Sequence, residues 1–341
     1  MKHVRKKRPR SPTKAGGLHP RNLHRGRYDF EALMNTSPAL AAVVRKNPHG
    51  DLSVDFADPE SVKLLNQALL THFYQVDSWD IPPAYLCPPI PGRSDYLHYV
   101  ADLLAETPGN ATDAIPRGRK IKALDVGMGA NCIYPIVGSR LYGWDFVGTD
   151  IDPIALRCAS IIADSNPVLK EQIECRLQAS AQNIFRGVIG AREAFDLTLC
   201  NPPFHASLAE ANAGTRQKVR NLAASTKKKG TQVRSAERPG ATGVQPLNFG
   251  GQGAELWCPG GEAAFIARMI TESAEFSEQC LWFSSLVSRK DHLPGIYRRL
   301  DRVGARGVRT MEMQQGQKIT RLVAWTFMTA EHQGQWCQTR W

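Results

Sequence analysis

The stretch "IKALDVGMGANCIYP", residues 121–135, decides the fold class, because a short apolar strand pattern runs directly into a pair of glycines. From there to the C-terminus, strand and helix patterns alternate. Further strands are expected at residues 144–152, 173–179, 194–200 and 280–288, and helices at 152–166, 261–276 and 295–304. This alternation predicts an α/β fold with an open, mostly parallel sheet and helices on both faces. Residues 308–314 and 321–328 are expected to close the sheet as an antiparallel pair.

Two helices are expected before this domain. The first covers residues 56–74, with Asp58 as N-cap and Pro59 at the first helical position. The second covers residues 94–106 and is expected to be capped by Ser94. We therefore expect three parts, which are a disordered basic tail (1–27), a helical subdomain (28–115) and the α/β domain (116–341) with a basic flexible insertion at about 205–253.

The positive charge of the chain lies in two of these segments. Residues 1–27 carry ten Lys or Arg and no Asp or Glu, and residues 205–249 carry eight and two. They contribute +10 and +6 to a formal net charge of +11, so the rest of the chain sums to −5. Basic segments attached to an acidic core are a common way to hold a polyanion by its phosphates. The alternative is a solubilising tail and a solvated loop.

The cysteines and the hydropathy exclude some classes of protein. The eight cysteines form no C-x-x-C pair, which is typical of reduced thiols and not of a disulfide framework or a zinc site. No apolar run is long enough to span a bilayer. We therefore expect no metal and no membrane partner.

The two glycines also indicate a ligand. In an open α/β sheet, ligands bind outside the carboxyl ends of the strands. There, Gly127 and Gly129 let the backbone turn tightly and approach a ligand closely. Asp150 ends the next strand, at the separation where a carboxylate accepts hydrogen bonds from ribose hydroxyls. The alternative is a tight turn followed by an unrelated helix-capping Asp.

The nature of the ligand follows from what the glycine motif lacks. The glycine motif that binds dinucleotides has a small third residue, which would fall at position 132, where this chain has Cys132. A cofactor that has ribose and adenine but no phosphate does not require the full glycine motif. S-adenosylmethionine is such a cofactor. Asp125, inside the first strand, has three possible roles: it orients the glycine loop, contacts the methionine amine of that cofactor, or caps a turn.

A second group of functional residues follows the strand at 194–200. Two adjacent prolines continue neither a strand nor a helix, yet the strand ends in Asn201, Pro202, Pro203 and Phe204. Methylating an exocyclic amine of a base requires acceptors that hold its two hydrogens. The Asn201 oxygen and the Pro202 carbonyl, fixed by the prolines, are such acceptors. Phe204 offers a face on which an extruded base stacks. The alternative is a structural turn with a buried Phe.

Six stretches together resemble the bacterial 23S rRNA (adenine-N6) methyltransferase F family and its eukaryotic relatives that methylate adenine in structured RNA. The match extends over nearly the whole chain, from about Leu18 to the last strands. The stretches are "FADPESVKLLNQALL", "LCPPIPGRSDYLHYVADLL", "LDVGMGANCIYPIVG", "CNPPFHAS", "LNFGGQGAEL" and "GGEAAFIARMI". The resemblance implies a class I methyltransferase (Rossmann-like) domain with a mostly parallel seven-stranded sheet and an antiparallel C-terminal hairpin. It also implies that the N-terminal helical subdomain binds or caps the RNA.

The resemblance also implies the reaction. The methyl donor is S-adenosylmethionine, without a metal, and the substrate is one adenine of 23S ribosomal RNA, free or in a large-subunit assembly intermediate. A cytoplasmic monomer is expected. By the same resemblance, Arg93 lies near the cofactor pocket and pairs with the methionine carboxylate, and Asn183 lies where an adenine-binding residue falls. Their alternatives are a surface Arg and an ordinary loop Asn. Glu262 is expected in the first turn of a helix rather than as a catalytic acid, and Trp257 either stacks on RNA or docks on the protein.

Two other functions stay open from the sequence. Asn, Pro, Pro and an aromatic residue suit any planar nitrogen acceptor, so a DNA adenine or a protein glutamine methyltransferase is one alternative. The basic segments argue against a protein side chain but do not separate RNA from DNA. The other alternative is an RNA-binding ribosome-assembly factor with an inactive methyltransferase fold. The intact glycine pair, Asp150 and Asn201–Phe204 count against it.

Overall fold

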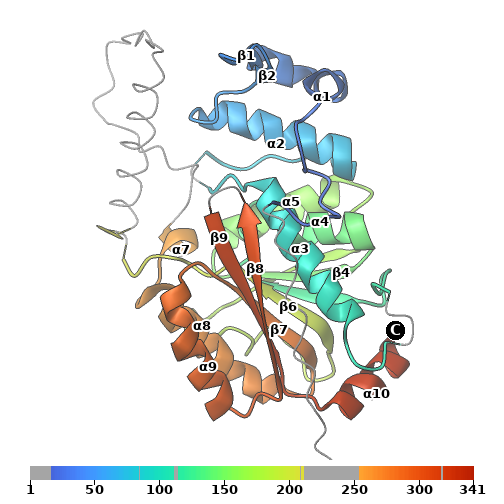
Figure 1. The fold of residues 1–341 in the computed structure, drawn as a ribbon, viewed down its shortest axis with the longest axis vertical. Coiled ribbons are helices and arrows are strands. Elements are labelled where there is room, and N and C mark those ends of the chain that lie inside the picture. Colours follow the sequence, from blue (N-terminus) through green and yellow to red (C-terminus); the bar gives the residue numbers. More distant parts are fainter. Residues whose placement is uncertain (1–16, 84, 111–113, 208, 211–252, 316–317) are drawn as a thin grey trace, which may run out of the picture.

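The computed structural model describes residues 17–83, 85–110, 114–207, 209–210, 253–315 and 318–341. In this part of the chain, one seven-stranded sheet has the order β5-β4-β3-β6-β7-β9-β8 (Figure 1). Its strands are β3 (Lys122–Val126), β4 (Asp145–Asp150), β5 (Ile173–Leu177), β6 (Phe195–Cys200), β7 (Cys280–Val287), β8 (Gly307–Gln315) and β9 (Lys318–Thr326). The predicted fold class is confirmed. The predicted insertion lies almost entirely outside the described residues.

The register of the sheet determines where a site can form. The first five strands, β3 to β7, pair in parallel, whereas β9 is antiparallel to both β7 and β8. Val126 at the end of β3 pairs with Thr149 of β4 on one side and with Cys200 of β6 on the other. The carboxyl ends of the three central strands are therefore level, and the residues that follow them meet at one edge of the sheet.

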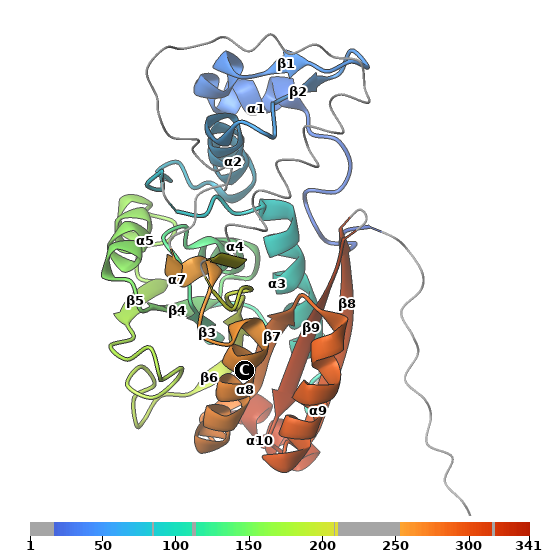
Figure 2. The ribbon, with the colours of Figure 1, turned by 90° about the vertical axis from the view of Figure 1, so that its left-hand side faces the viewer.

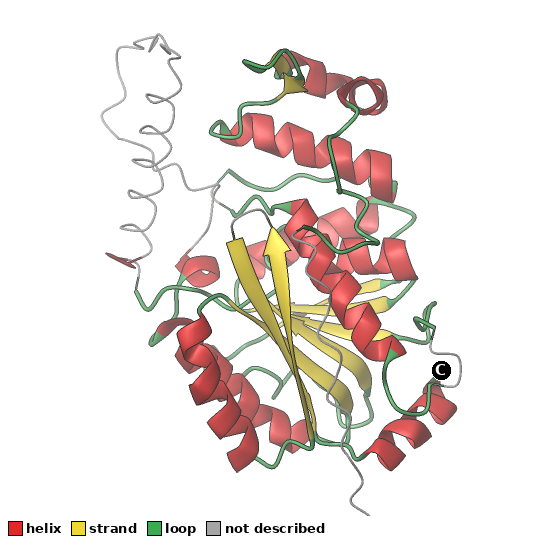
Figure 3. Cartoon of the chain, viewed as in Figure 1, coloured by secondary structure: helices red, strands yellow, loops and turns green. Residues whose placement is uncertain are grey.

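Helices cover both faces of the sheet, as the sequence predicted (Figures 2 and 3). On β3, Ala123 belongs to the core beneath α3, α4 and α5, and Leu124 belongs to the core beneath α8 and α9. This alternation is that of a strand buried on both faces. The helices that cover the sheet are α3 (Ile90–Ala105), α4 (Ile133–Tyr142), α5 (Pro153–Ser165), α8 (Gly261–Ser273) and α9 (Leu293–Arg302). Short helical segments are α7 (Gly253–Leu256), η2 (Ala274–Phe276) and η3 (Lys290–His292).

The N-terminal elements form a separate layer beyond one end of the sheet (Figure 1). They are α1 (Phe30–Thr36), η1 (Pro38–Ala42), β1 (Arg45–Lys46), β2 (Leu52–Ser53) and α2 (Pro59–Tyr74). The predicted cap of α2 is confirmed, because the Asp58 side chain accepts a hydrogen bond from Ser61 N. The predicted cap of α3 is wrong. This helix begins four residues earlier, at Ile90, and Ser94 is buried inside it. Pro91 at the start explains the difference, since proline is favoured in the first helical turn.

Residues 17–27 correct the predicted extent of the disordered tail, because they pack on the folded domain. His19, Asn22 and His24 are all buried. His19 N and Asn22 Nδ2 both donate to Asp95 of α3, and His24 Nε2 lies 2.7 Å from the Tyr74 hydroxyl of α2. The amino-acid composition did not indicate that this segment is ordered. Its imidazole and amide side chains are polar, and their buried hydrogen-bond partners lie in distant parts of the chain. Residues 1–16 lie outside the described residues.

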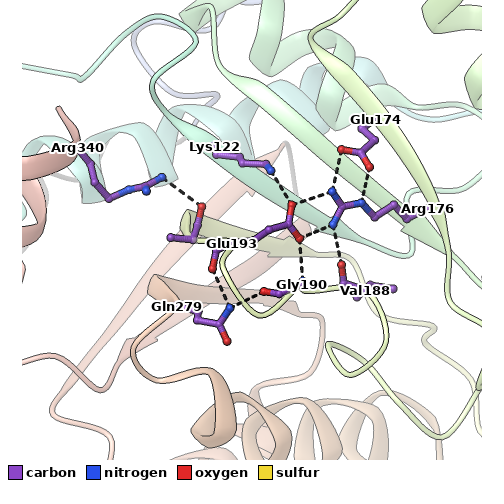
Figure 4. A network of polar contacts seen from close by, with 9 residues as sticks. Lys122, Glu174, Arg176, Val188, Gly190, Glu193, Gln279 and Arg340 are labelled. Carbon is purple, nitrogen blue, oxygen red and sulfur yellow. Dashed lines mark hydrogen bonds and ion pairs between the residues drawn. The ribbon is translucent and has the colours of Figure 1, made fainter.

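A C-terminal helix that the sequence did not predict completes the fold. Helix α10 (Ala330–Arg340) docks beside the start of β6, where Trp336 Nε1 and Trp341 Nε1 donate to buried Asp196. Its segment has no apolar stripe, so hydropathy gave no helical signal. Next to this contact, Glu193 pairs with Lys122 and Arg176 and fixes the loop before β6 (Figure 4).

No helix in the described ranges is long and apolar enough to cross a membrane. All eight cysteines are free thiols. Within the part of the chain that the structure describes, no group of three or more His, Cys, Asp or Glu side chains is arranged to hold a metal ion.

Candidate active site

A cavity of about 490 Å³ lies at the level carboxyl ends of β3, β4 and β6. Most of the residues selected from the sequence line it, although they are far apart in the chain. These are Arg93, Gly127, Gly129, Asp150, Asn183, Asn201 and Pro203. The other three selected residues, Asp125, Pro202 and Phe204, are not part of its lining. One cavity therefore joins the two groups that the sequence suggested separately.

The glycine loop brings backbone rather than side chain to the cavity. Gly127 and Gly129 have φ angles of 71° and 69°, a left-handed conformation that favours glycine. The N–H groups of Gly127 and Met128 both donate to Thr149 O, which ties the loop to the end of β4. A side chain at Gly127 would meet no atom within 4 Å. The absence of a Cβ there thus leaves the backbone open to the cavity.

Asp150 joins the glycine loop to the end of β4. Its Oδ2 accepts a hydrogen bond from Gly129 N, and its Oδ1 accepts one from Asp152 N, both at 2.9 Å. Burial raises the pKa of this carboxyl, although the backbone donors oppose the shift. A carboxylate has about four lone-pair positions, so its backbone donors do not use all of them and a ligand hydroxyl can also donate to it. This geometry fits the ribose role expected from the sequence.

Asp125 is the most unusual polar side chain of the site. Both carboxylate oxygens are buried, and neither has a hydrogen-bond partner among the described residues. Burial, and then the nearby charge of Asp150, raise its pKa to about 8, while the Arg93 guanidinium acts in the opposite direction. A buried carboxyl without partners is costly, so its position favours a ligand that brings a donor or a positive charge.

Arg93 extends from the first turn of α3 into the cavity and does not lie on the surface. Its Nη1 donates to the Tyr134 hydroxyl at 2.8 Å, and its guanidinium lies 5.6 Å from the centre of the Tyr134 ring. Tyr134 is itself buried in α4. The hydrogen bond to Tyr134 thus holds the guanidinium in place and leaves several of its five N–H donors for a ligand. Such a group suits a ligand carboxylate.

Asn183 lies in the loop after β5, which borders the cavity on the other side of Asp150. Glu272 of α8, which the sequence did not single out, fixes this loop. Its buried carboxylate accepts hydrogen bonds from the N–H groups of Ile184, Phe185 and Arg186 at 2.7 to 3.1 Å. A carboxylate 86 to 88 residues further along the chain carries no local pattern, so only the fold reveals this function.

The Asn-Pro-Pro-Phe segment follows β6 directly. The Asn201 side-chain oxygen is buried and has no hydrogen-bond partner among the described residues. Pro202 is buried, and Phe204 is half-buried. Just before them, Cys200 N donates to the Tyr96 hydroxyl of α3 at 3.2 Å. An acceptor without a protein partner at the wall of a cavity fits the expected role of holding an amine hydrogen.

The segment beyond Phe204 is paired with the residues that follow the predicted insertion. His205 N donates to Leu256 O at 3.0 Å, and Cys258 N donates to His205 O at 3.1 Å, so His205 and Trp257 form a β-bridge. Trp257 lines the cavity, whereas Phe204 does not. This pairing brings an indole to the same cavity as Asn201, a position that sequence spacing alone did not reveal.

Glu262 lies in the first turn of α8, as predicted, and it is not part of the cavity lining. Its buried carboxylate accepts hydrogen bonds from Ser288 N at 2.7 Å and makes a 2.6 Å contact with His292 Nδ1. The adjacent Gly261 packs against the backbone of His205 and Ala206. Glu262 therefore ties the start of α8 to the segment that follows β7.

The residues present fit the cofactor expected from the sequence. Arg93 suits a carboxylate, Asp125 suits an ammonium group and Asp150 suits ribose hydroxyls, and all three lie at or behind one cavity wall. S-adenosylmethionine carries these three groups and has no phosphate, which agrees with the absence of a phosphate-sized cluster of cations among the described lining residues.

Known proteins share both the sequence and the fold. A family model described as "RNA methyltransferase" matches residues 13–329. The ribosomal RNA large subunit methyltransferase F of Photobacterium profundum is 55% identical over 336 residues, which cover 98% of this chain and 98% of that protein. The enzyme of the same name from Serratia proteamaculans is 53% identical over 330 residues, which cover 97% and 93%.

The solved structure of a human protein is similar to this chain over almost the same range. The catalytic domain of human METTL16 in complex with the MAT2A 3′UTR hairpin 1 has a TM-score of 0.71 at 29% identity, and the match covers 92% of this chain and 96% of that chain. The family model matches residues 13–329, and the two bacterial relatives are 55% and 53% identical to this chain. This degree of sequence similarity is greater than a shared fold alone produces. The chain belongs to the ribosomal RNA large subunit methyltransferase F family of RNA methyltransferases.

Proposed function

We propose that this protein transfers a methyl group from S-adenosylmethionine to the exocyclic N6 of one adenine in 23S ribosomal RNA. The observation that carries the proposal is the buried, unpartnered Asn201 oxygen in the same cavity as Gly127, Gly129 and Asp150. The names of the bacterial relatives support large-subunit ribosomal RNA as the substrate. When bound, S-adenosylmethionine supplies a sulfonium methyl group that is already activated for transfer.

The protein contributes position rather than acid–base chemistry. The nitrogen of an exocyclic amine is a weak nucleophile, because its lone pair is delocalised into the ring. In the proposed mechanism, Asn201 Oδ1 accepts one amine hydrogen and the Pro202 carbonyl accepts the other, which directs the nitrogen lone pair toward the cavity. Pro202 and Pro203 restrict the backbone, so the acceptors lose little entropy on binding. Holding both reactants in this way supplies most of the rate.

The target base needs a surface to lie on once it leaves the RNA. Phe204 is the side chain we propose for stacking, and Trp257 provides a second aromatic face at the cavity. Stacking of a base on an aromatic side chain contributes about 1–3 kcal/mol and offsets the cost of unstacking it from RNA. Arg93, Asp125, Asp150 and Asn183 hold the donor in this proposal.

RNA binding outside the cavity is assigned to the basic segments and the N-terminal subdomain. We propose that residues 28–115 form an RNA-binding cap and that residues 1–16 and the insertion at about 205–253 hold phosphates. The proposed boundary at residue 115 follows α3, which itself packs on the sheet through the Tyr96–Ser284 hydrogen bond of 2.8 Å. A monomer in the cytoplasm, acting on ribosomal RNA or on an assembly intermediate, completes the proposal.

One experiment tests the substrate. Mass mapping of adenine methylation in 23S RNA from cells with and without this gene should show one N6-methyladenine that depends on the gene. Purified protein should restore it on RNA from the deletion strain when S-adenosylmethionine is supplied. Unchanged ribosomal RNA, with methylation found instead in DNA or on protein glutamine, would contradict the proposal.

A further inference from the structure

Glu255 of α7 brings a carboxylate to the glycine loop, and it is not among the residues selected from the sequence. Its Oε2 accepts a hydrogen bond from Leu86 N at 3.1 Å. Its Oε1 lies so close to Gly129 that a Cβ on that glycine would be 3.0 Å away. Glu255, Leu86 and Gly129 all line the cavity. The carboxylate is thus held over the loop where the cofactor is expected.

The charges of the proposed cofactor restrict what this carboxylate can contact. S-adenosylmethionine has one carboxylate, one ammonium group on the same carbon atom, and one sulfonium. Arg93 suits the carboxylate, so the ammonium group must lie close to Arg93 as well. Asp125 is the acid that interacts electrostatically with Arg93, and its unpartnered oxygens suit the ammonium group. The sulfonium is left without an assigned partner.

The position of Glu255 matches the part of the cofactor that remains. The sulfonium joins the methionine carbon chain to the ribose, and the ribose end is marked by Asp150. Asp150 Oδ2 accepts a hydrogen bond from Gly129 N at 2.9 Å, and Glu255 Oε1 lies beside the same glycine, 3.0 Å from where its Cβ would be. Among the described acids of the cavity, Glu255 is therefore placed at the junction between the ribose and the methionine chain.

We propose that Glu255 recognises the positive charge of the sulfonium and so discriminates S-adenosylmethionine from the thioether product, S-adenosylhomocysteine. The inference rests on the proposed function, because it requires that donor. An anion near a charge that disappears during the reaction binds the donor more tightly than the product. Glu255 then favours exchange of spent product for fresh donor after each turnover.

Calorimetric titration of the full-length protein without RNA tests the proposal. The three ligands are S-adenosylmethionine, S-adenosylhomocysteine and sinefungin, in which a protonated amine replaces the sulfonium methyl. Glu255→Gln should weaken binding of the two cationic ligands about tenfold and that of S-adenosylhomocysteine less than about threefold, because only the former lose a charge interaction in a low-dielectric site. Equal weakening of all three ligands, or no weakening, would overturn the proposal.

The ratio of affinities also separates this effect from a loss of folding. A misfolded fraction lowers the apparent number of sites for all three ligands alike, so it leaves the ratio unchanged. Glu255→Asp keeps the charge and should keep most of the preference for the two cationic ligands over S-adenosylhomocysteine. Loss of that preference in Glu255→Asp would also count against the proposal. Glu312→Gln is a matched control, since Glu312 forms an ion pair with Arg321 at 3.2 Å but does not line the cavity. It should leave all three affinities unchanged.

The same titration distinguishes failure of the inference from failure of the proposed function. If the wild-type protein binds none of the three ligands, the assignment of the donor is wrong and the inference falls with it. If the wild type binds all three and Glu255→Gln does not alter their ratio, the donor assignment stands and only the role of Glu255 is rejected.

Discussion

The hydroxyl of Tyr96 accepts a hydrogen bond from the backbone N–H of Cys200 at 3.2 Å, so a helix of the N-terminal half holds the last residue before Asn201. The same hydroxyl contacts Ser284 Oγ of β7 at 2.8 Å. Tyr96 is fully buried, and its contacts bridge β6 and β7 at the level where the Asn201–Phe204 segment leaves the sheet. Through Tyr96, which does not line the cavity, α3 therefore supports the backbone that leads into Asn201.

Tyr96→Phe should consequently lower kcat more than it lowers cofactor affinity. The variant keeps the ring and its packing but removes both hydrogen bonds, so Asn201 loses part of its support. We expect about a tenfold fall in kcat, because small misplacements of reacting groups have effects of this order or larger. Single-turnover methylation and titration with S-adenosylhomocysteine measure the two quantities. A change in affinity as large as the change in kcat would contradict this role.

Asn201→Ala should abolish nearly all methyl transfer while leaving the cofactor bound. The substitution removes one of the two acceptors proposed to hold the amine, and the oxygen that it deletes has no described protein partner to release. We expect a loss of at least about two orders of magnitude in kcat, in line with the removal of an interaction made in the transition state. Asn201→Asp provides the control, since it keeps an acceptor oxygen. Near-normal turnover by the alanine variant would reject the mechanism.

The buried Asp125 carboxyl should make the stability of the protein depend on pH. The folded protein raises the pKa of this carboxyl to about 8, from an ordinary value of about 3.9. An acid with a raised pKa takes up a proton on folding, so its contribution to the free energy of unfolding falls as pH rises from about 4 to about 8 and is constant above that. Asp125→Asn has no carboxyl to ionise, so its free energy of unfolding does not fall in this way. The melting temperature of the variant should therefore exceed that of the wild type by a margin that grows from about pH 4 to about pH 8.

The same carboxyl links cofactor binding to proton release. If Asp125 receives the ammonium group, it must ionise, and below about pH 8 binding then releases a proton. Wild-type affinity for S-adenosylhomocysteine should rise with pH up to about 8, and that of Asp125→Asn should be lower and nearly flat. Titration in buffers of different ionisation enthalpy counts the protons. Equal pH profiles for the two proteins would exclude Asp125 as the ammonium partner.

The tail is expected to act on RNA only through its first part. Residues 17–27 are packed on α2 and α3, so deleting them would disturb the fold, whereas residues 1–16 carry seven Lys or Arg and lie before the packed segment. Deletion of residues 1–16 should weaken RNA binding and flatten the slope of log affinity against log salt, because fewer counterions are released. Cofactor affinity should not change. An unaltered slope would mean that the tail does not contact phosphates.

The sequence predicted those parts of the site whose signal is local. Gly127 and Gly129 follow one strand and Asp150 ends the next, at characteristic spacings, and Asn201–Phe204 follow a third strand with a pair of prolines that packing does not require. Glu255 and Glu272 were missed for a common reason. Each acts on a backbone far away in the chain, Leu86 in one case and Ile184 in the other, so nothing in its own neighbourhood marks it.

The errors at the two ends of the chain have a related cause. Residues 17–27 and α10 contain few apolar side chains, and composition therefore indicated disorder for one and no helix for the other. Both are held instead by buried hydrogen bonds to acids, Asp95 in the first case and Asp196 in the second. Periodicity detects apolar faces, and it does not detect a polar segment whose partner is a single buried carboxylate.

Asp196 gives the last prediction, which concerns stability alone. It is fully buried at the start of β6, where its Oδ2 accepts Lys122 N at 2.8 Å and its Oδ1 accepts the indole N–H groups of Trp336 and Trp341 at 2.7 and 2.9 Å. Asp196→Ala would leave these donors, which belong to half-buried residues, unpaired, at a cost of about 1–3 kcal/mol for each one that water does not reach. The contact lies at the amino end of the strand, away from the cavity at its carboxyl end.

We therefore expect Asp196→Ala to lower the melting temperature by at least about 5 °C, since about 1 kcal/mol corresponds to a few degrees in a domain of this size. Affinity for S-adenosylhomocysteine at 15 °C should stay within about twofold of the wild type, because the cavity is unchanged. Trp336→Phe is the matched control: it removes one indole donor, keeps an aromatic ring against Arg340, and should cause a smaller fall. A melting temperature equal to that of the wild type would show that α10 does not depend on this carboxylate, and a large loss of affinity would show that the two ends of β6 are coupled.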